Sequence, residues 1–136
     1  MRKLLTLFLI MNGLLLNAQI PTRTEFFNVC DSLGIHHGNV VWAQARLESG
    51  NFQHGVYKTK HNCLGIYDSK KKEYSSFNNW IECVIAYRDK VQCKCKTPYC
   101  TDDEYLDWII RMGYAADTSY RAKVEKIMKQ ETKNKK

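Results

Sequence analysis

The sequence has 136 residues, a formal net charge of +7 and six cysteines. This length suits one domain with a single hydrophobic core and excludes a large multidomain protein. The basic charge is typical of a protein with an anionic partner, such as a cell wall, a nucleic acid or a membrane surface, and does not choose among them. The sequence contains no repeat, no glycine-rich phosphate loop and no heptad run, which argues against repeat, nucleotide-binding and coiled-coil proteins.

The first 18 residues have the pattern of a secretory signal peptide. Residues 1–3 are basic, residues 4–16 are apolar, and Leu16-Asn17-Ala18 is typical of a signal-peptidase site. The apolar run is short for a membrane span, and no second such run follows it. We therefore expect a secreted or periplasmic protein with no stable membrane insertion after cleavage, in which residues 19–136 form one domain. An uncleaved N-terminal anchor is the alternative.

All six cysteines lie in the expected mature part, at positions 30, 63, 83, 93, 95 and 100. An even number of cysteines in a small exported domain predicts disulfides, here bracing a hairpin and the loop 92–100 against helices. A zinc site is the alternative, because three cysteines cluster and His61 lies near Cys63, but the spacing matches no common zinc motif. We expect no bound metal and leave the disulfide pairing open.

The mature part begins with two closely connected helices. Thr22 and Glu25 form a capping box, and the helix that follows ends at Gly34. After a short connection, apolar residues recur at helical spacing from Val40, and Gly50 suits a left-handed C-terminal cap. A connection this short requires the two helices to pack as neighbours.

Glu48 falls in the last turn of this second, mostly apolar helix. Partial burial and the negative end of the helix dipole would both raise the pKa of its carboxyl group. A carboxyl group that stays protonated near neutral pH can act as the general acid that glycoside cleavage requires. Taken alone, the stretch favours a solvated surface glutamate, so the assignment depends on the rest of the chain.

Beyond Glu48 the pattern changes and then returns to helix. Residues 63–67 and 73–77 are short strand-like segments around a polar turn, which predicts a small β-hairpin. Three helices follow, beginning near Asn79, Thr101 and Asp117, and the last is expected to run into a disordered basic tail from about residue 130. The sequence therefore predicts an α+β, mostly helical fold with about five helices and one small hairpin.

Four segments, in the right order, match the motifs of one known family. Residues 43–50, Ala-Gln-Ala-Arg-Leu-Glu-Ser-Gly, resemble the A-Q-A-x-L-E-S-G motif of the bacterial glucosaminidases of glycoside hydrolase family 73. Residues 61–66 resemble their N-N-L-F-G-I segment, and residues 74–87 resemble the segment that leads into their next helix. Residues 113–120 resemble G-Y-A-x-D-P-x-Y, with Thr118 in place of the proline. The resemblance implies a lysozyme-like architecture.

What the resemblance implies is hydrolysis of the β-1,4 bond between N-acetylglucosamine and N-acetylmuramic acid in peptidoglycan. It makes Glu48 the general acid and Tyr114 a cleft tyrosine that assists catalysis or sugar positioning. The expected substrate-binding residues are Asn62, Gly65, Tyr74 and Trp80. Tyr114 and Trp80 could instead be core residues, and the segment 62–65 a simple turn. We expect a monomer that acts on peptidoglycan glycan strands, binds no nucleic acid and needs no cofactor.

The sequence departs from the family at the second carboxylate. Many members carry a second glutamate on a longer β segment, whereas only a short turn separates Tyr67 from Tyr74 here. Asp68 and Glu73 are the nearby carboxylates that could replace it, or else solvated turn residues. The retaining or inverting outcome therefore stays open. So do two alternatives, a lytic transglycosylase that uses a single glutamate and a cysteine-stapled module that binds glycan without cutting it.

Overall fold

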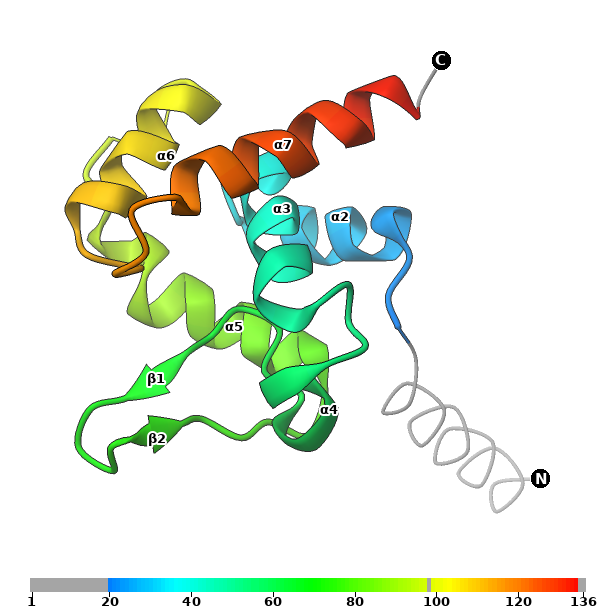
Figure 1. Cartoon of the computed structure of the whole chain (residues 1–136), viewed down its shortest axis with the longest axis vertical. Coiled ribbons are helices and arrows are strands. Elements are labelled where there is room, and N and C mark those ends of the chain that lie inside the picture. The colour runs from blue at the N-terminus through cyan, green and yellow to red at the C-terminus, as the bar shows by residue number, and fades with distance from the viewer. Residues whose placement is uncertain (1–19, 98, 135–136) are drawn as a thin grey trace.

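The computed structural model describes residues 20–97 and 99–134, so the expected signal peptide lies outside the described residues. Within them the fold is α+β and mostly helical, with six α-helices, one short 3₁₀ helix and one two-stranded sheet (Figure 1). In chain order the elements are α2 (Arg23–Ser32), α3 (Gly38–Ser49), α4 (Gly55–Lys60), β1 (Tyr67–Asp68), β2 (Glu73–Tyr74), α5 (Trp80–Lys90), η1 (Gln92–Lys94), α6 (Asp102–Arg111) and α7 (Tyr120–Lys133). This confirms the predicted lysozyme-like fold class.

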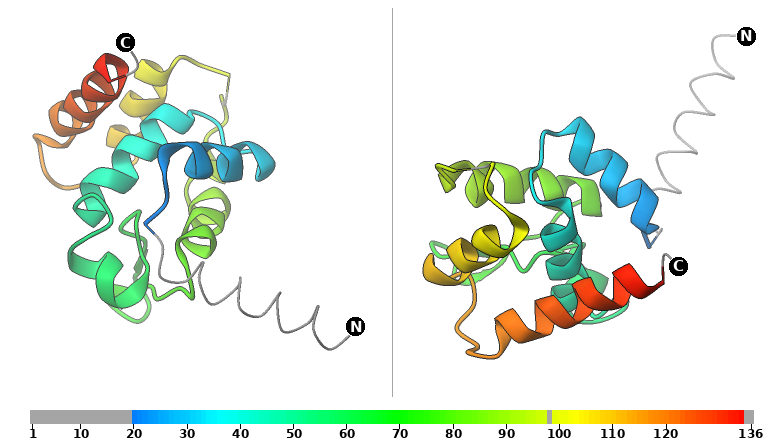
Figure 2. Two further views of the ribbon diagram at one scale, coloured as in Figure 1. Left: turned by 90° about the vertical axis from the view of Figure 1, so that its right-hand side faces the viewer. Right: turned by 90° about the horizontal axis from the view of Figure 1, so that it is seen from above.

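Helix α3 is the central element and packs against α2, α4, α6 and α7 (Figures 1 and 2). Every residue from Val40 to Ala45 is buried, which fits a helix covered on all sides. Its C-terminal end is less covered, and Leu47 and Glu48 are half-buried there. The same helix therefore anchors the core and carries Glu48 to the surface.

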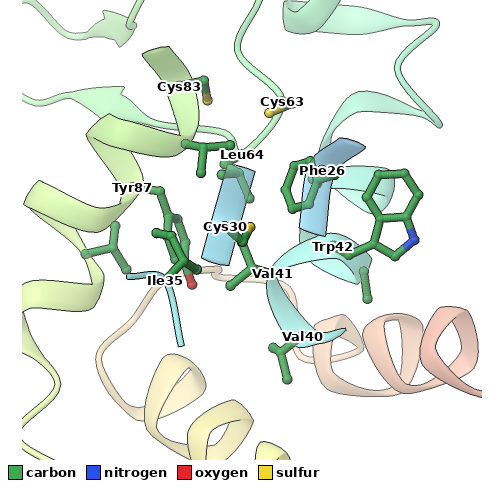
Figure 3. Close-up of a cluster of buried hydrophobic side chains, with 14 of the residues drawn as sticks. Phe26, Cys30, Ile35, Val40, Val41, Trp42, Cys63, Leu64, Cys83 and Tyr87 are labelled. Atoms are coloured by element: carbon green, nitrogen blue, oxygen red, sulfur yellow. The ribbon is translucent and has the colours of Figure 1, made fainter. Parts of the chain in front are cut away.

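An aromatic cluster joins α2, α3 and α5 in the core around Phe26 (Figure 3). The Phe26 ring is fully buried, stacks on Trp80 with ring centroids 5.6 Å apart, and lies 5.1 Å from the Trp42 ring. Trp80, one of the expected substrate-binding residues, is only 4% exposed. Its indole therefore belongs to the core.

The region between α3 and α5 differs from the prediction in its details. Residues 55–60 form α4, a helix of six residues that is too short to show helical periodicity in the sequence. The hairpin is present, with Tyr67 paired to Tyr74 and Asp68 to Glu73, but each strand has only two residues. At the other end of the chain, α7 continues to Lys133, past the point where a disordered tail was expected.

The predicted disulfides are not confirmed, because all six cysteines, each within the described residues, are free and no two sulfurs are at bonding distance. Cys63 and Cys83 are neighbours in the core (Figure 3), where burial and the Cys83 thiol raise the pKa of Cys63. Burial also raises the pKa of Cys30 to about 12. Protonated thiols of this kind pack as small apolar side chains.

The described residues include no group of three or more His, Cys, Asp or Glu side chains that could hold a metal ion. None of the described helices has the length and apolar character that crossing a membrane requires.

Candidate active site

Glu48 lies in the last turn of α3, as the sequence predicts. Gly50 ends the helix in the left-handed conformation, with φ 55°, and its N–H points back to the Arg46 and Leu47 carbonyls. The side chain of Glu48 faces an open hollow of about 350 Å³. Besides Glu48, its walls include Gly65, Tyr74, Tyr114, Asp117 and Tyr120. The hollow thus brings three of the expected site residues, Gly65, Tyr74 and Tyr114, to Glu48.

Burial raises the pKa of Glu48, and a hydrogen bond from Tyr120 partly offsets this rise. Desolvation disfavours the carboxylate, so the protonated acid persists to higher pH than in an exposed glutamate. The direction agrees with the sequence-based prediction. A half-buried carboxyl group that has a raised pKa and faces an open hollow is suited to general acid catalysis.

Tyr120 is held beside Glu48 by a buried chain of polar side chains. The Gln44 amide donates to the Tyr120 hydroxyl at 3.3 Å, and the Tyr87 hydroxyl donates to Gln44 Oε1 at 2.8 Å. Tyr87 also hydrogen-bonds the Tyr105 hydroxyl at 2.8 Å, and Gln92 donates to Tyr105 at 3.1 Å. No role in the site was expected from the sequence for Tyr87, Tyr105 or Tyr120, although Tyr87 and Tyr120 fall within segments that resemble the family. Gln44, a polar residue on an otherwise apolar stretch, is the signal that could have revealed the network.

The loop between α4 and β1 brings Gly65 against Glu48. Asn62 is fully buried, and its amide donates to the Ile66 and Ser75 carbonyls and accepts from the Ile66 N–H, all within 2.9 Å. These bonds fix the loop so that a Cβ atom on Gly65 would lie 2.9 Å from Glu48 Oε2. Asn62 therefore supports the loop that carries Gly65, and its buried amide is not on the wall of the hollow.

Replacement of Gly65 by alanine tests this close approach. The residue has a φ of +63°, and the new methyl group would collide with the Glu48 carboxylate. We expect stability to fall by about 1–2 kcal/mol from backbone strain and the turnover rate to fall about 10²-fold from displacement of Glu48. Gly55→Ala is the matched control, because Gly55 has a φ of +60° with nothing within 4 Å of the added methyl. Thermal unfolding should show strain in both variants, whereas an activity assay on the substrate that the resemblance implies should show a loss only in Gly65→Ala.

Tyr114 lies at the wall of the hollow, as the resemblance implies. Its hydroxyl donates to the Leu64 carbonyl, in the same loop as Gly65. Its ring lies 6.0 Å from the Tyr120 ring, measured between centroids. Burial raises the pKa of Tyr114 well above the usual tyrosine value, so the phenol stays neutral. Tyr114 therefore supports the loop and adds a neutral aromatic side chain to the wall of the Glu48 hollow.

The two hairpin carboxylates considered from the sequence lie elsewhere. Asp68 accepts the backbone N–H groups of Lys70 and Lys71 within the turn, at 2.9 and 3.2 Å. Glu73 is exposed and pairs with Lys60 at 3.2 Å. Neither residue is part of the wall of the Glu48 hollow.

Asp117 is a carboxylate that does line the Glu48 hollow. Its oxygens accept hydrogen bonds from Lys123 and from the hydroxyl and N–H of Ser119, and these interactions lower the pKa of Asp117 to about 2. Asp117 was expected to begin the last helix and falls in the segment 113–120 that resembles a family motif, but it was not among the expected site residues. The hollow thus contains one carboxyl group with a raised pKa and one with a lowered pKa, the combination found where acid and base roles are divided.

The comparison with known families covers the residues of this site. The model of the Glucosaminidase family, described as mannosyl-glycoprotein endo-beta-N-acetylglucosaminidase, matches residues 24–133. The chain belongs to this glucosaminidase family. The matched residues include all of α3, the hairpin and the loop before α7, so the whole Glu48 hollow of this glucosaminidase lies inside them. No curated protein and no solved structure matches the chain.

Proposed function

We propose that this glucosaminidase cleaves the β-1,4 bond between N-acetylglucosamine and N-acetylmuramic acid in peptidoglycan, with Glu48 as the general acid. The observation that carries the proposal is the raised pKa of Glu48 at the wall of an open hollow, within a chain of a glycosidase family. A protonated carboxyl group at such a position can protonate a leaving-group oxygen.

The reaction divides between the two carboxyl groups of the hollow. Glu48 gives its proton to the glycosidic oxygen as the bond from that oxygen to the anomeric carbon breaks. We assign the ionised Asp117, in place of Asp68 or Glu73, to stabilise the positive charge that develops on the sugar, because Asp117 lines the hollow. Water then adds to the anomeric carbon, and its proton restores Glu48. Tyr120 holds the Glu48 carboxyl group in place throughout.

Tyr120→Phe should move the alkaline limb of the pH–rate profile to higher pH. Glu48 acts in its protonated form, so the rate falls as the pH rises through its pKa. Tyr120 lowers that pKa through its hydrogen bond, and removal of the hydroxyl therefore raises it. Tyr105→Phe is the matched control, since it removes a hydroxyl group from the same network without contacting Glu48. An unchanged limb in Tyr120→Phe, or an equal shift in both variants, would contradict the role of Tyr120.

The proposal is tested by the release of new reducing ends from purified peptidoglycan. We expect release that declines at alkaline pH, because Glu48 loses its proton there. Binding to peptidoglycan without new reducing ends at any pH from about 4 to 8 would instead identify a non-catalytic glycan-binding module.

A lytic transglycosylase is the second candidate. The observation that favours it is the short hairpin, which contributes no carboxylate to the Glu48 hollow. In such an enzyme the hydroxyl group of the substrate's own sugar, rather than water, attacks the anomeric carbon, and one glutamate is sufficient. The two reactions leave chemically different ends on the glycan.

We also infer that the chain acts as a monomer outside the cytoplasm, in the periplasm or after secretion. Its proposed substrate lies there, and the basic N-terminal segment followed by an apolar run is consistent with export. Fractionation of cells that express the full chain, with N-terminal sequencing of the exported product, tests this inference.

A further inference from the structure

A second, larger hollow of about 650 Å³ adjoins the Glu48 hollow. Gly65 and Tyr114 belong to the walls of both, so the two meet at the loop that the Asn62 side chain fixes. The remaining walls come from the hairpin and from the end of α5 with η1, which lie on the same side of the molecule (Figure 1). A chain-like substrate that reaches Glu48 could therefore continue into this second hollow.

Three lysines line the second hollow: Lys70 in the hairpin turn, Lys90 at the end of α5, and Lys94 in η1. None of them forms an ion pair with a described residue. The three lysines do not belong to one basic run in the sequence. It is the fold that brings them to the same hollow.

The two aspartates of the same hollow do not cancel this charge. Asp89 is paired with Arg88, whose Nε lies 2.8 Å from Asp89 Oδ1. Asp68 accepts the two N–H groups of the turn, and its carboxylate also faces the positive charge of Lys90. Lys70 and Lys94 therefore give the hollow a positive surplus.

An exposed pair of tyrosines bridges the two hollows. Tyr67 and Tyr74 are 54% and 44% exposed and lie opposite each other on the hairpin, with ring centroids 5.5 Å apart. Tyr67 lines the lysine-lined hollow, and Tyr74 lines the Glu48 hollow. Exposed aromatic rings beside a cleft offer flat apolar faces against which sugar rings can pack.

We propose that the lysine-lined hollow binds the carboxylate-bearing peptide substituents of a peptidoglycan strand, while Tyr67 and Tyr74 hold the sugar rings between this hollow and Glu48. The inference rests on the proposed function and deepens it, since it names the part of the substrate that the chain distinguishes. Ammonium groups bind carboxylates through charge-assisted hydrogen bonds. Peptide carboxylates are attached to the glycan strand itself, so they arrive beside the hollow when a strand lies at Glu48.

The test uses a double variant, Lys70→Gln with Lys94→Gln, in a chain that also carries Glu48→Gln. Because this chain does not cut the ligand, calorimetry can compare a peptide-bearing glycan fragment with a neutral N-acetylglucosamine oligomer of equal sugar length. We expect about tenfold weaker binding of the peptide-bearing fragment and unchanged binding of the neutral oligomer. The matched control is Lys126→Gln with Lys129→Gln, two exposed α7 lysines on a different hollow, which removes the same charge.

Equal weakening for both ligands, or equal weakening by the α7 control, would overturn the inference. Displacement of the peptide-bearing fragment by low millimolar inorganic phosphate would reassign the hollow to phosphate-rich polymers. In a chain that retains Glu48, the double variant Lys70→Gln with Lys94→Gln should raise KM for peptide-bearing glycan and leave kcat unchanged. If the parent chain releases no reducing ends and the selective loss of binding persists, the proposed hydrolysis fails while this binding site stands.

Discussion

Glu48→Gln is expected to lower the rate of peptidoglycan hydrolysis by about 10²–10⁴-fold and to leave the fold intact. Glutamine has nearly the same shape, so the half-buried side chain keeps its contacts with Gly65 and Tyr120. It has no acidic proton to give to the glycosidic oxygen. The measurement is turnover of purified peptidoglycan, with circular dichroism to confirm folding. A variant that lyses the substrate as fast as the parent would refute the assignment.

The same substitution has a thermodynamic signature. The folded state raises the pKa of Glu48, so the parent loses stability as the pH rises through that value. Glutamine does not ionise, and the melting temperature of the variant should exceed that of the parent above this pH, with little difference below about pH 4. Glu82→Gln should behave oppositely, because hydrogen bonds from Asn78 lower the pKa of Glu82. Its stability deficit should appear above about pH 4.

Phe26→Ala is expected to reduce the free energy of unfolding by about 3–5 kcal/mol. The ring is fully buried between Trp80 and Trp42, and its removal leaves a cavity where α2, α3 and α5 meet. This is a large share of the stability of a small domain, which is typically about 5–15 kcal/mol. Chemical denaturation followed by tryptophan fluorescence would measure the change.

Phe27→Ala is the matched control for this prediction. Phe27 is adjacent in α2 but only half-buried. The guanidinium carbon of Arg23 lies over its ring, 4.0 Å from the ring centroid. We expect a clearly smaller loss, because less of the ring leaves water on folding. Equal losses in the two variants would contradict the central place of Phe26 in the core.

The features that depend on nearby residues could be predicted from the sequence. Apolar residues at helical spacing and a following Gly50 were sufficient to place Glu48 in a last helical turn, and the capping box expected at Thr22 forms there. The short α4 was missed, because six residues give too few turns to show a period.

The features that depend on distant residues could not be predicted in the same way. Gln44 accepts a hydrogen bond from Tyr87 and donates one to Tyr120, and these bonds join side chains 43 and 76 positions apart. Asp117 lies in the segment 113–120 that resembles a family motif, but no catalytic role was expected for it, and the packing of α7 on α3 brings it to the Glu48 hollow. The cysteine count suggested disulfides, but bonding requires two sulfurs to meet, and that is set by the packing of separate elements.

Mass spectrometry of digested peptidoglycan tests the central claim most directly. The parent chain is predicted to leave free reducing N-acetylglucosamine ends, and the Glu48→Gln chain is predicted to leave almost none over the same time. Anhydro-muramic ends from the parent would contradict the claim and identify a lytic transglycosylase. Equal yields of reducing N-acetylglucosamine from both chains would contradict the role of Glu48.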